Sequence, residues 1–226
     1  RLAILVLILS VCIGVPLGIL SAVKQNSLLD TIPTMIAFFL AAVPSFVVGI
    51  VLMYIFALRL NLFRPYGLDS IKDYVLPVIA ATICELSAYL RFTKSSMLES
   101  IRQDYVRTAR AKGQSERVVI WKHALRNALI PVMTVIGLNF GRLLGGIAIC
   151  EAVFAVPGVG KLIVDAIPIK NTPLVQGGIL FIAFAMSIIN LITDVLYAYV
   201  DPRIRSQYVR RKAPKKMAAV EGGESK

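Results

Sequence analysis

The chain contains few of the residues that bind metals, cross-link domains or act as acids and bases in catalysis. Its 226 residues include one histidine and three cysteines. Cys12, Cys84 and Cys150 each lie inside an apolar run, without a CxxC spacing or a nearby histidine, and we interpret them as small core residues. His123, the single histidine, is expected to make packing and polar contacts. The sequence predicts neither catalytic residues nor a metal site in this chain.

Charged residues are scarce as well, at 17% of the chain, whereas hydrophobic residues make up 57%. The mean hydropathy of +0.75 is far above that of a soluble domain of this size. We therefore predict an all-α integral membrane protein in contact with lipid. The 25 Lys and Arg residues outnumber the 13 Asp and Glu residues. They lie next to apolar runs, as topology signals do, so no nucleic-acid partner is expected.

Five apolar segments are long enough to cross a hydrocarbon core of roughly 30 Å as helices. They cover about 2–23, 32–58, 75–95, 130–150 and 174–200. The second contains a Pro44-Ser45-Phe46 break, which either lines a pathway or simply bends the helix. We predict a helical bundle of five spans in a transmembrane domain that covers residues 1–205.

The distribution of Lys and Arg orients these spans. The segment 91–126 carries nine and the tail from Asp201 carries eight, whereas the loops 59–74 and 151–173 carry three and two. By the positive-inside rule the two rich segments lie in the cytoplasm, and the C-terminus lies there with them. The last residues, 206–226, are basic and then rich in Ala, Gly and Glu, which predicts a disordered cytoplasmic tail.

The beginning of the chain is unusual for this topology. Five spans with a cytoplasmic C-terminus leave Arg1 outside the cell. The chain starts without an initiator Met and without the pattern of a signal peptide. We therefore expect a further span to precede Arg1 in the native protein, which would give six spans in all.

A polar and strongly basic stretch, Glu99–Pro131, separates the third and fourth apolar segments. Apolar residues recur at helical spacing on both sides of Gly113, so the loop 96–129 is predicted to form a helix, a glycine break and a second helix. Small residues flanked by long basic ones occupy Thr108–Gly113. Such a segment can press its backbone into a groove of a partner protein, or it can lie on anionic lipid headgroups. The residue pattern alone leaves both interpretations open.

Two parts of this stretch carry a family resemblance. Asp104–Gly113 (DYVRTARAKG) and Lys122–Pro131 (KHALRNALIP) resemble the cytoplasmic coupling loop, or EAA loop, of binding-protein-dependent ATP-binding-cassette importers. The most similar are permease subunits of the dipeptide, oligopeptide and nickel class. Further motifs follow in the order of that family: Ile13–Gly18, Pro44–Phe46, Met97–Glu99, Gly141–Gly146, Glu151–Gly160 and Asp201–Arg205. The general Glu-Ala-Ala opening is replaced by Arg107-Thr108-Ala109, with Gly113 in register, which is the version expected of the peptide subgroup.

The resemblance implies a role in transport without catalysis by this chain. It implies a second homologous permease, two cytoplasmic ATP-binding subunits that hydrolyse ATP and an extracytoplasmic solute-binding protein, at a prokaryotic inner membrane. Closure of the ATPases on ATP would move the loops and reorient the spans. The residues expected to contact the ATPase are Arg107, Thr108, Ala109, Lys112 and Gly113. The cargo stays open among dipeptides, oligopeptides, nickel complexes and glutathione. The family also implies six spans, with a large extracytoplasmic insertion after the first.

Two sets of residues within the spans are candidates for packing or for a pathway. Three glycines lie four residues apart, and we favour a helix interface over a ligand surface for them: Gly137, Gly141 and Gly145. Three ionisable residues should face inward, because exposure to lipid would cost each about 3 kcal/mol or more: Glu85, Arg142 and Asp194. They either pair with one another or with solvent at helix ends, or they line the pathway.

Other functions fit the sequence less well. The segment nearest to a Walker loop, Ala155–Leu162, lacks the first Gly and the final Ser or Thr, so the energy of transport must come from another subunit. No apolar segment carries the GxSxG or the paired acids of an intramembrane hydrolase. An ion-coupled secondary transporter would explain buried charges and a broken helix, and it is the alternative. It would not account for a long polar loop with a central glycine.

Overall fold

The computed structural model describes residues 1–67 and 70–200, and these residues form helices and no strands. The α-helices are α1 (Leu2–Val23), α2 (Leu28–Ala42), α3 (Ser45–Leu52), α4 (Val75–Ile101), α5 (Asp104–Ala111), α6 (Glu116–Val118), α7 (Leu125–Gly146), α8 (Ala148–Val153), α9 (Val159–Ala166) and α10 (Thr172–Val200). Two π-helical segments continue α3 and lead into α7, and a 3-10 turn leads into α4: η1 (Met53–Arg59), η3 (Val119–Ala124) and η2 (Ile71–Tyr74). The predicted tail 206–226 and the Asp201–Arg205 motif lie outside the described residues.

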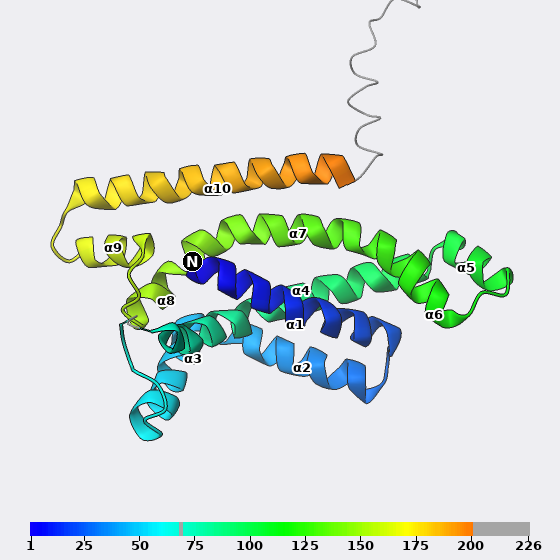
Figure 1. Cartoon of the computed structure of the whole chain (residues 1–226), viewed down its shortest axis with the longest axis horizontal. Helices are drawn as coiled ribbons and strands as arrows, with labels where there is room; N and C mark the ends of the chain where they lie inside the picture. The colour runs from blue at the N-terminus through cyan, green and yellow to red at the C-terminus, as the bar shows by residue number, and fades with distance from the viewer. Residues whose placement is uncertain (68–69, 201–226) are drawn as a thin grey trace, which may run out of the picture.

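The long helices lie side by side along the longest axis of the molecule (Figure 1). α4 is central, because α1, α2 and α7 all pack against it. α10 lies beyond α7 on the outside of the bundle and also touches α9. α5 and α6 project at one end of the bundle, and α3 and η1 lie at the opposite end. The polar stretch of the sequence is therefore held at one extremity of the molecule.

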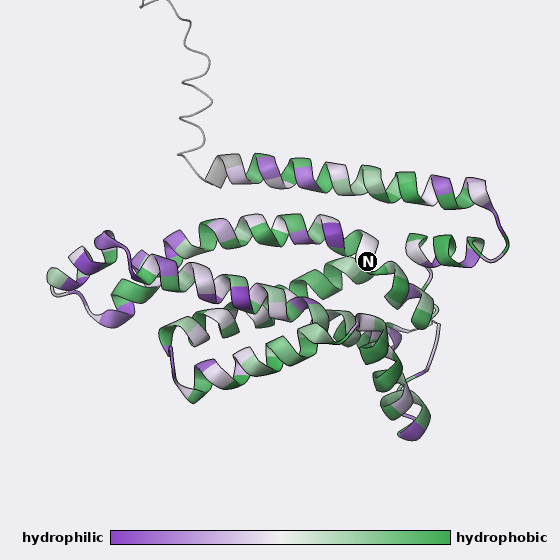
Figure 2. Cartoon of the chain, turned by 180° about the vertical axis from the view of Figure 1, so that it is seen from behind, coloured by the Kyte–Doolittle hydropathy of each residue, from purple (hydrophilic) through white to green (hydrophobic). Residues whose placement is uncertain are grey.

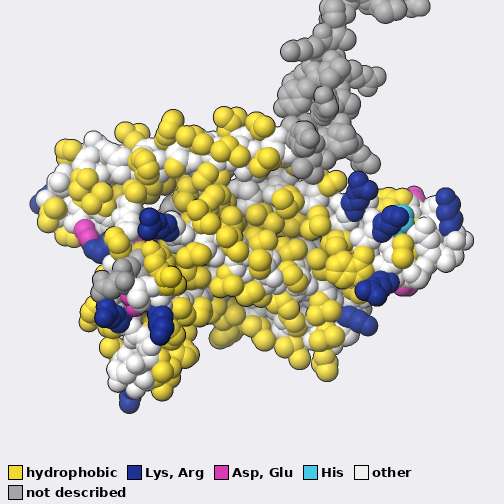
Figure 3. All heavy atoms as spheres, viewed as in Figure 1, with side chains coloured by type: hydrophobic (Ala, Val, Ile, Leu, Met, Phe, Trp, Pro, Cys, Tyr) yellow, Lys and Arg dark blue, Asp and Glu magenta, His cyan; other side chains and the backbone are white. Residues whose placement is uncertain are grey.

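The long helices have the length and composition of membrane spans. Within the described residues four helical segments qualify, and the bent pair of α2 with α3 and η1 makes five if it is counted as one span. The four are Leu2–Val23, Ile71–Ile101, Glu116–Val153 and Thr172–Tyr197. Hydrophilic residues concentrate around α5 and α6 (Figure 2), and on the face shown in Figure 3 an apolar middle separates two ends where Lys and Arg gather. This is the distribution of an integral membrane protein.

α1 and α4 approach each other closely because α1 presents small residues to α4. A Cβ added to Gly18 would lie 2.7 Å from the carbonyl oxygen of Leu90, and one added to Gly14 would lie 2.9 Å from the Cβ of Tyr89. Ser10, one turn earlier, is completely buried. Small residues four apart bring helix backbones into contact where lipid supplies little hydrophobic drive.

The second predicted span, 32–58, is not one straight helix. The helical segment begins earlier, at Leu28, and its two halves are bent by 98°. Val43 is extended, with φ −91° and ψ 125°, because a following proline disfavours the helical conformation. Pro44 then begins α3 as its N-cap. The segment is therefore a broken helix pair, and α3 leaves the direction of α2.

Two further boundaries differ from the predicted ones. The third span was expected to end near residue 95, but α4 continues to Ile101 and so carries its last turns into the polar stretch. The segment 151–173 was expected to be a loop, but it contains the end of α8 and all of α9. The helices therefore extend well beyond the apolar segments that predicted them.

Candidate functional site

The projecting end of the molecule is built on a small apolar core. α5 turns two residues inward, Val106 at 0% exposure and Ala109 at 5%. They belong to one cluster of buried residues with Met97 of α4, Val119 of η3 and Ala128 of α7. Because this core joins α4, α5, η3 and α7, the loop is a compact unit fixed to the ends of two long helices.

Gly113 ends α5 with a left-handed backbone, at φ +75°. Its N–H donates to the carbonyl of Arg110 at 2.9 Å, and the N–H of Gln114 donates to the carbonyl of Ala109 at 3.4 Å. These two bonds form a Schellman motif, where glycine is favoured because it has no Cβ to oppose a positive φ. A Cβ on Gly113 would meet no atom within 4 Å. The position is therefore open on its outer side.

Polar contacts hold the turn between α5 and η3. The Nε of Arg110 donates to Oε1 of Glu116 at 2.6 Å, in an exposed ion pair that contributes little to stability. The ring Nε2 of His123 lies 2.7 Å from Oε1 of Gln114. The second half of the loop is thus connected to the first through side chains as well as through the apolar core.

Basic side chains cover the outer surface of this unit. The exposed ones are Arg102, Arg107, Arg110, Lys112, Arg117, Lys122 and Arg126. Asp104 and Glu116 offset part of this charge by pairing with their basic neighbours. Figure 3 shows the Lys and Arg side chains gathered at this end of the molecule. The surface offers positive charge to an acidic partner surface or to lipid headgroups.

The five residues predicted to contact an ATPase do not all lie on this surface. Four of them are exposed: Arg107, Thr108, Lys112 and Gly113. Ala109 faces the apolar core, because it lies three residues after Val106 on the inner side of α5. Ala109 therefore positions α5 within the single chain, and contact with an ATPase stays a prediction for the five residues.

The glycine face of α7 lies against α10. A Cβ added to Gly137 would lie 2.1 Å from Cγ2 of Thr193, and one added to Gly141 would lie 2.7 Å from Oδ1 of Asn190. The contact loosens towards Gly145, whose added Cβ would be 4.0 Å from the nearest atom. Gly137 and Gly141 therefore lie in a close helix contact within this chain, and Gly145 lies at its looser end.

Two of the three ionisable residues predicted within the spans lie on neighbouring helices. Glu85 on α4 is partly buried, and its charge interacts with that of Arg142 on α7. No direct ion pair joins these two described residues. Arg142 and Asp194 are both exposed on the single chain. Of the three, only Glu85 is partly buried within the single chain, and whether Arg142 and Asp194 line a pathway stays a prediction.

A buried polar cluster at the ends of α1, α2 and α4 was missed in the sequence. Asp30, 5% exposed, forms an ion pair with Lys94. Its carboxylate also accepts hydrogen bonds from the hydroxyls of Ser21 and Thr34 at 2.8 and 3.3 Å and from the N–H of Asn26 at 3.0 Å. Burial of a charge requires such pairing and hydrogen bonding. The cluster fastens three helices together close to the loop.

The Glu151–Gly160 motif lies between α7 and α10 and covers the end of α8, the connecting turn and the start of α9. Oε2 of Glu151 accepts the backbone N–H of Lys161 at 3.1 Å, so the carboxylate lies at the N-terminus of α9, where negative charge is favoured. A Cβ on Gly158 would lie 2.3 Å from this carboxylate, and one on Gly160 would lie 2.3 Å from Cα of Ala148. Both glycines make room for the close approach of α8 and α9.

A comparison with known families agrees with this bundle and its projecting helical loop. The model of the family described as "Binding-protein-dependent transport system inner membrane component" matches residues 14–206. The chain belongs to that family. It is therefore a multi-pass component of the inner membrane, and its family is one of transport permeases and not of enzymes.

Relatives of this inner-membrane component include permeases for small peptides. The dipeptide transport system permease protein DppB of Alkalihalophilus pseudofirmus is 40% identical, over 91% of this chain and 70% of its own length. The glutathione transport system permease protein GsiC of Salmonella choleraesuis is 42% identical, over 88% of this chain and 65% of its own length. The GsiC protein of Escherichia coli K12 is 41% identical, over 87% and 64%. This family member thus spans about two thirds of the length of these relatives.

Solved structures show the same fold at low sequence identity. The MetNI methionine ABC transporter in an inward-facing conformation matches with a TM-score of 0.74 and 18% identity, over 88% of this chain and 91% of that chain. An amino acid ABC transporter matches with a TM-score of 0.67 and 14% identity, over 89% and 88%. The fold of this inner-membrane component is therefore that of an ABC transporter transmembrane domain.

Proposed function

We propose that this chain is a permease subunit of an ATP-driven importer for peptides or related small solutes. It would form the translocation pathway with a second permease, dock on two cytoplasmic ATP-binding subunits and receive cargo from an extracytoplasmic solute-binding protein. The observation that carries this proposal is the identity of 40 to 42% to the dipeptide and glutathione permeases over about nine tenths of the chain. Family membership favours this function over an ion-coupled secondary transporter.

The geometry of α5 supports docking on an ATPase. Its outer side exposes Arg107, Thr108 and Lys112, and its inner side is fixed to the spans by a buried core. A displacement of α5 would therefore move the ends of α4 and α7 instead of bending a flexible loop. ATP would be bound and hydrolysed by the partner subunits, whose closure supplies the displacement. In this arrangement the loop and the C-terminus lie in the cytoplasm.

The exposed charge on α7 supports a pathway or a permease interface on that side of the bundle. Arg142 lies within a span and is exposed, and a cation facing lipid there is costly. Glu85 on the neighbouring helix α4 is close enough for its charge to interact with that of Arg142. We assign this side to the second permease or to the water-filled pathway.

Reconstitution tests the function directly. The chain is expressed together with the second permease, the ATP-binding subunits and the solute-binding protein of the same system. We expect the four components to copurify and to take up radiolabelled dipeptide or glutathione only with ATP. Uptake by the permease alone, driven by an ion gradient and abolished by an ionophore, would establish a secondary transporter instead.

Charge reversal tests the docking surface. Arg107→Glu combined with Lys112→Glu is expected to reduce copurification of the ATPases at least about tenfold, because the positive surface at α5 is lost. Lys170→Glu, an exposed cation outside the loop, is the matched control and should leave ATPase binding unchanged. Equal ATPase binding by both variants would contradict docking through α5.

A further inference from the structure

Two buried serines of α4 fasten this helix to the beginning of α7. The hydroxyl of Ser96 donates to the carbonyl of Ala128 at 2.8 Å, and the hydroxyl of Ser100 donates to the carbonyl of Ala124 at 2.8 Å. Each serine is one helical turn from the other, and so is each alanine. Ala124 and Ala128 are 0% and 2% exposed, and their small side chains let the two backbones approach. The two hydrogen bonds form a ladder between the helices.

Ser100 also joins the ladder to α5. Its oxygen lies 2.6 Å from the phenolic oxygen of Tyr105. A hydroxyl has a single proton, and Ser100 uses its proton on the carbonyl of Ala124, so Tyr105 must be the donor to Ser100. A directed chain of hydrogen bonds therefore runs from Tyr105 on α5 through Ser100 on α4 to Ala124 at the end of η3. Bonds in such a chain polarise and strengthen one another.

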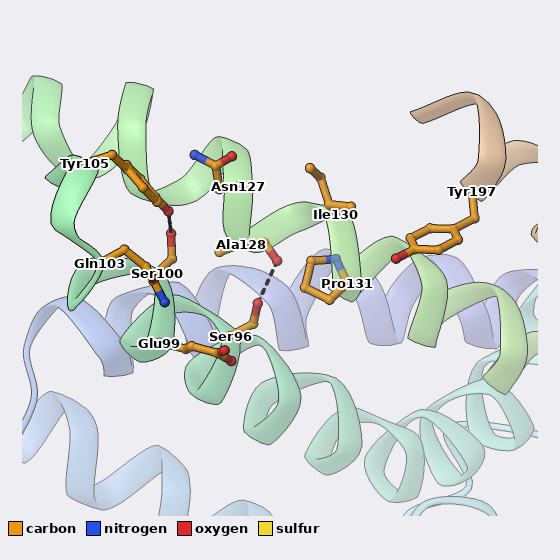
Figure 4. Close-up of a pocket in the computed structure, with 10 residues that line it drawn as sticks. All are labelled: Ser96, Glu99, Ser100, Gln103, Tyr105, Asn127, Ala128, Ile130, Pro131 and Tyr197. Atoms are coloured by element: carbon orange, nitrogen blue, oxygen red, sulfur yellow. Dashed lines mark hydrogen bonds between the residues drawn. The ribbon is translucent and has the colours of Figure 1, made fainter. Parts of the chain in front are cut away.

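The ladder borders a cavity of about 550 Å³ (Figure 4). Ser96, Ser100 and Tyr105 line one part of the cavity, and Tyr197 of α10 lines the far part. Side chains do not fill the space between the ladder and α10. Because side chains do not fill this space, the loop is held to the spans there by the hydrogen bonds and the small apolar core. The loop also has room to shift towards α10.

We propose that the Tyr105–Ser100–Ala124 chain, together with the parallel Ser96–Ala128 hydrogen bond, is the link that carries a displacement of α5 into α4 and α7. Ser100 is then a positioning residue for transport, since it binds neither cargo nor nucleotide. This inference rests on the proposed function and adds the residues that transmit the movement. It explains why a hydroxyl is buried where α4, α5 and η3 meet.

The ratio of transport to ATP hydrolysis tests this link. The complete complex of permeases, ATPases and binding protein is reconstituted in liposomes, and uptake and ATP hydrolysis are measured together. Ser100→Ala is expected to lower uptake per ATP about tenfold, an effect of the size that one buried hydrogen bond can produce. Ser100→Thr keeps the hydroxyl and should restore most of the ratio. Ser96→Ala should have a smaller effect, because Ser96 lies one turn farther from α5.

Two further variants separate this role from a structural one. Ser95→Ala removes an exposed serine of α4 next to Ser96 and should leave the ratio unchanged. Tyr105→Phe removes only the hydroxyl of a side chain that is 41% exposed. It should therefore lower uptake per ATP without affecting assembly of the complex. If Ser100→Ala does not assemble, Tyr105→Phe tests the proposal in its place. Unchanged uptake per ATP in Ser100→Ala and Tyr105→Phe, or a parallel loss of uptake and hydrolysis, would overturn the proposal. Lack of ATP-driven uptake by the unaltered complex would contradict the proposed function instead.

Discussion

The pair of α1 and α4 and the helix α10 are attached to the bundle in opposite ways. Half of the residues in the most apolar stretch of Ile71–Ile101, which includes α4, are buried inside the bundle. None of the residues in the most apolar stretch of Thr172–Tyr197, in α10, is buried. α1 meets α4 through buried small residues, and the ion pair of Asp30 with Lys94 joins α2 to α4, whereas α10 meets the bundle mainly through the glycine face of α7. The first pair is a fixed core. α10 leaves most of its apolar surface uncovered by the rest of the described chain.

The largest effect is expected from breaking the ion pair in the fixed core. Lys94→Met leaves Asp30 buried without a cation, which should lower the free energy of unfolding by about 4 kcal/mol. Lys161→Met breaks the exposed pair with Asp165 and should cost about 0.5 kcal/mol or less. Thermal unfolding of the purified proteins in detergent measures both changes. Equal losses would show that the α1–α4 region is no more rigid than the α9 region.

A double variant gives a sharper test of the same pair. Asp30→Asn added to Lys94→Met removes the stranded charge and should recover more than half of the lost stability, because the neutral amide still finds the hydroxyl of Ser21 and the N–H of Asn26. If the double variant is less stable than Lys94→Met, the charge of Asp30 has another partner.

The second largest effect is expected at the contact between α1 and α4. Gly18→Leu places side-chain atoms against the backbone of α4, which cannot move aside, and should lower the free energy of unfolding by about 3 kcal/mol. The matched control is Gly177→Leu on α10, where an added Cβ meets nothing within 4 Å. The amount of folded protein in membranes and its thermal stability report the difference. A similar loss of stability in Gly18→Leu and Gly177→Leu would show that α1 and α10 do not differ in how tightly they pack.

A smaller loss is expected where α7 meets α10. Gly137→Leu also creates a clash, but its neighbour is the side chain of Thr193 on a helix that little else restrains. α10 can shift outward, so we expect a loss of about 2 kcal/mol in the free energy of unfolding, less than for Gly18→Leu. A loss larger than that of Gly18→Leu would place α10 among the fixed elements.

The smallest effect among the glycine substitutions is expected at Gly113. Gly113→Val forces a branched side chain into a positive φ and should destabilise the end of α5 by about 1 kcal/mol. Gly113→Asn tolerates this conformation and should cost only a few tenths of that. Hydrogen exchange of the α5 amides measures the local effect, and uptake measures the coupling. If Val and Asn behave alike, the bulk of the side chain matters more than the backbone conformation.

Much of the bundle followed from the sequence because long apolar runs have few alternatives in a membrane. The loop was also predictable, since Gly113 interrupts a helical pattern and does end α5. The inward turn of Ala109 was harder to foresee. A small residue among basic ones suits an outer contact as well as an inner one, and only the packing of α5 on Met97 and Val119 decides between them.

Features that depend on distant parts of the chain could not be predicted. The bend at Pro44 had a visible signal, but its size of 98° depends on the packing of α3 against α4 and α8. The pairing of Asp30 with Lys94 joins residues in different helices, and no local pattern matches one to the other. Gly14 and Gly18 are an exception, because their spacing of four is the small-residue pattern of a helix contact and was overlooked.

The pair of Asp30 and Lys94 also sets an order of events during synthesis. Chains grow at about 5–20 residues per second, so the ribosome needs roughly 3 to 13 seconds to make the residues from Asp30 to Lys94. During that time α1 and α2 are made, but the carboxylate of Asp30 has no Lys94 to pair with. The ion pair that joins α2 to α4 can therefore form only after residue 94 has been made.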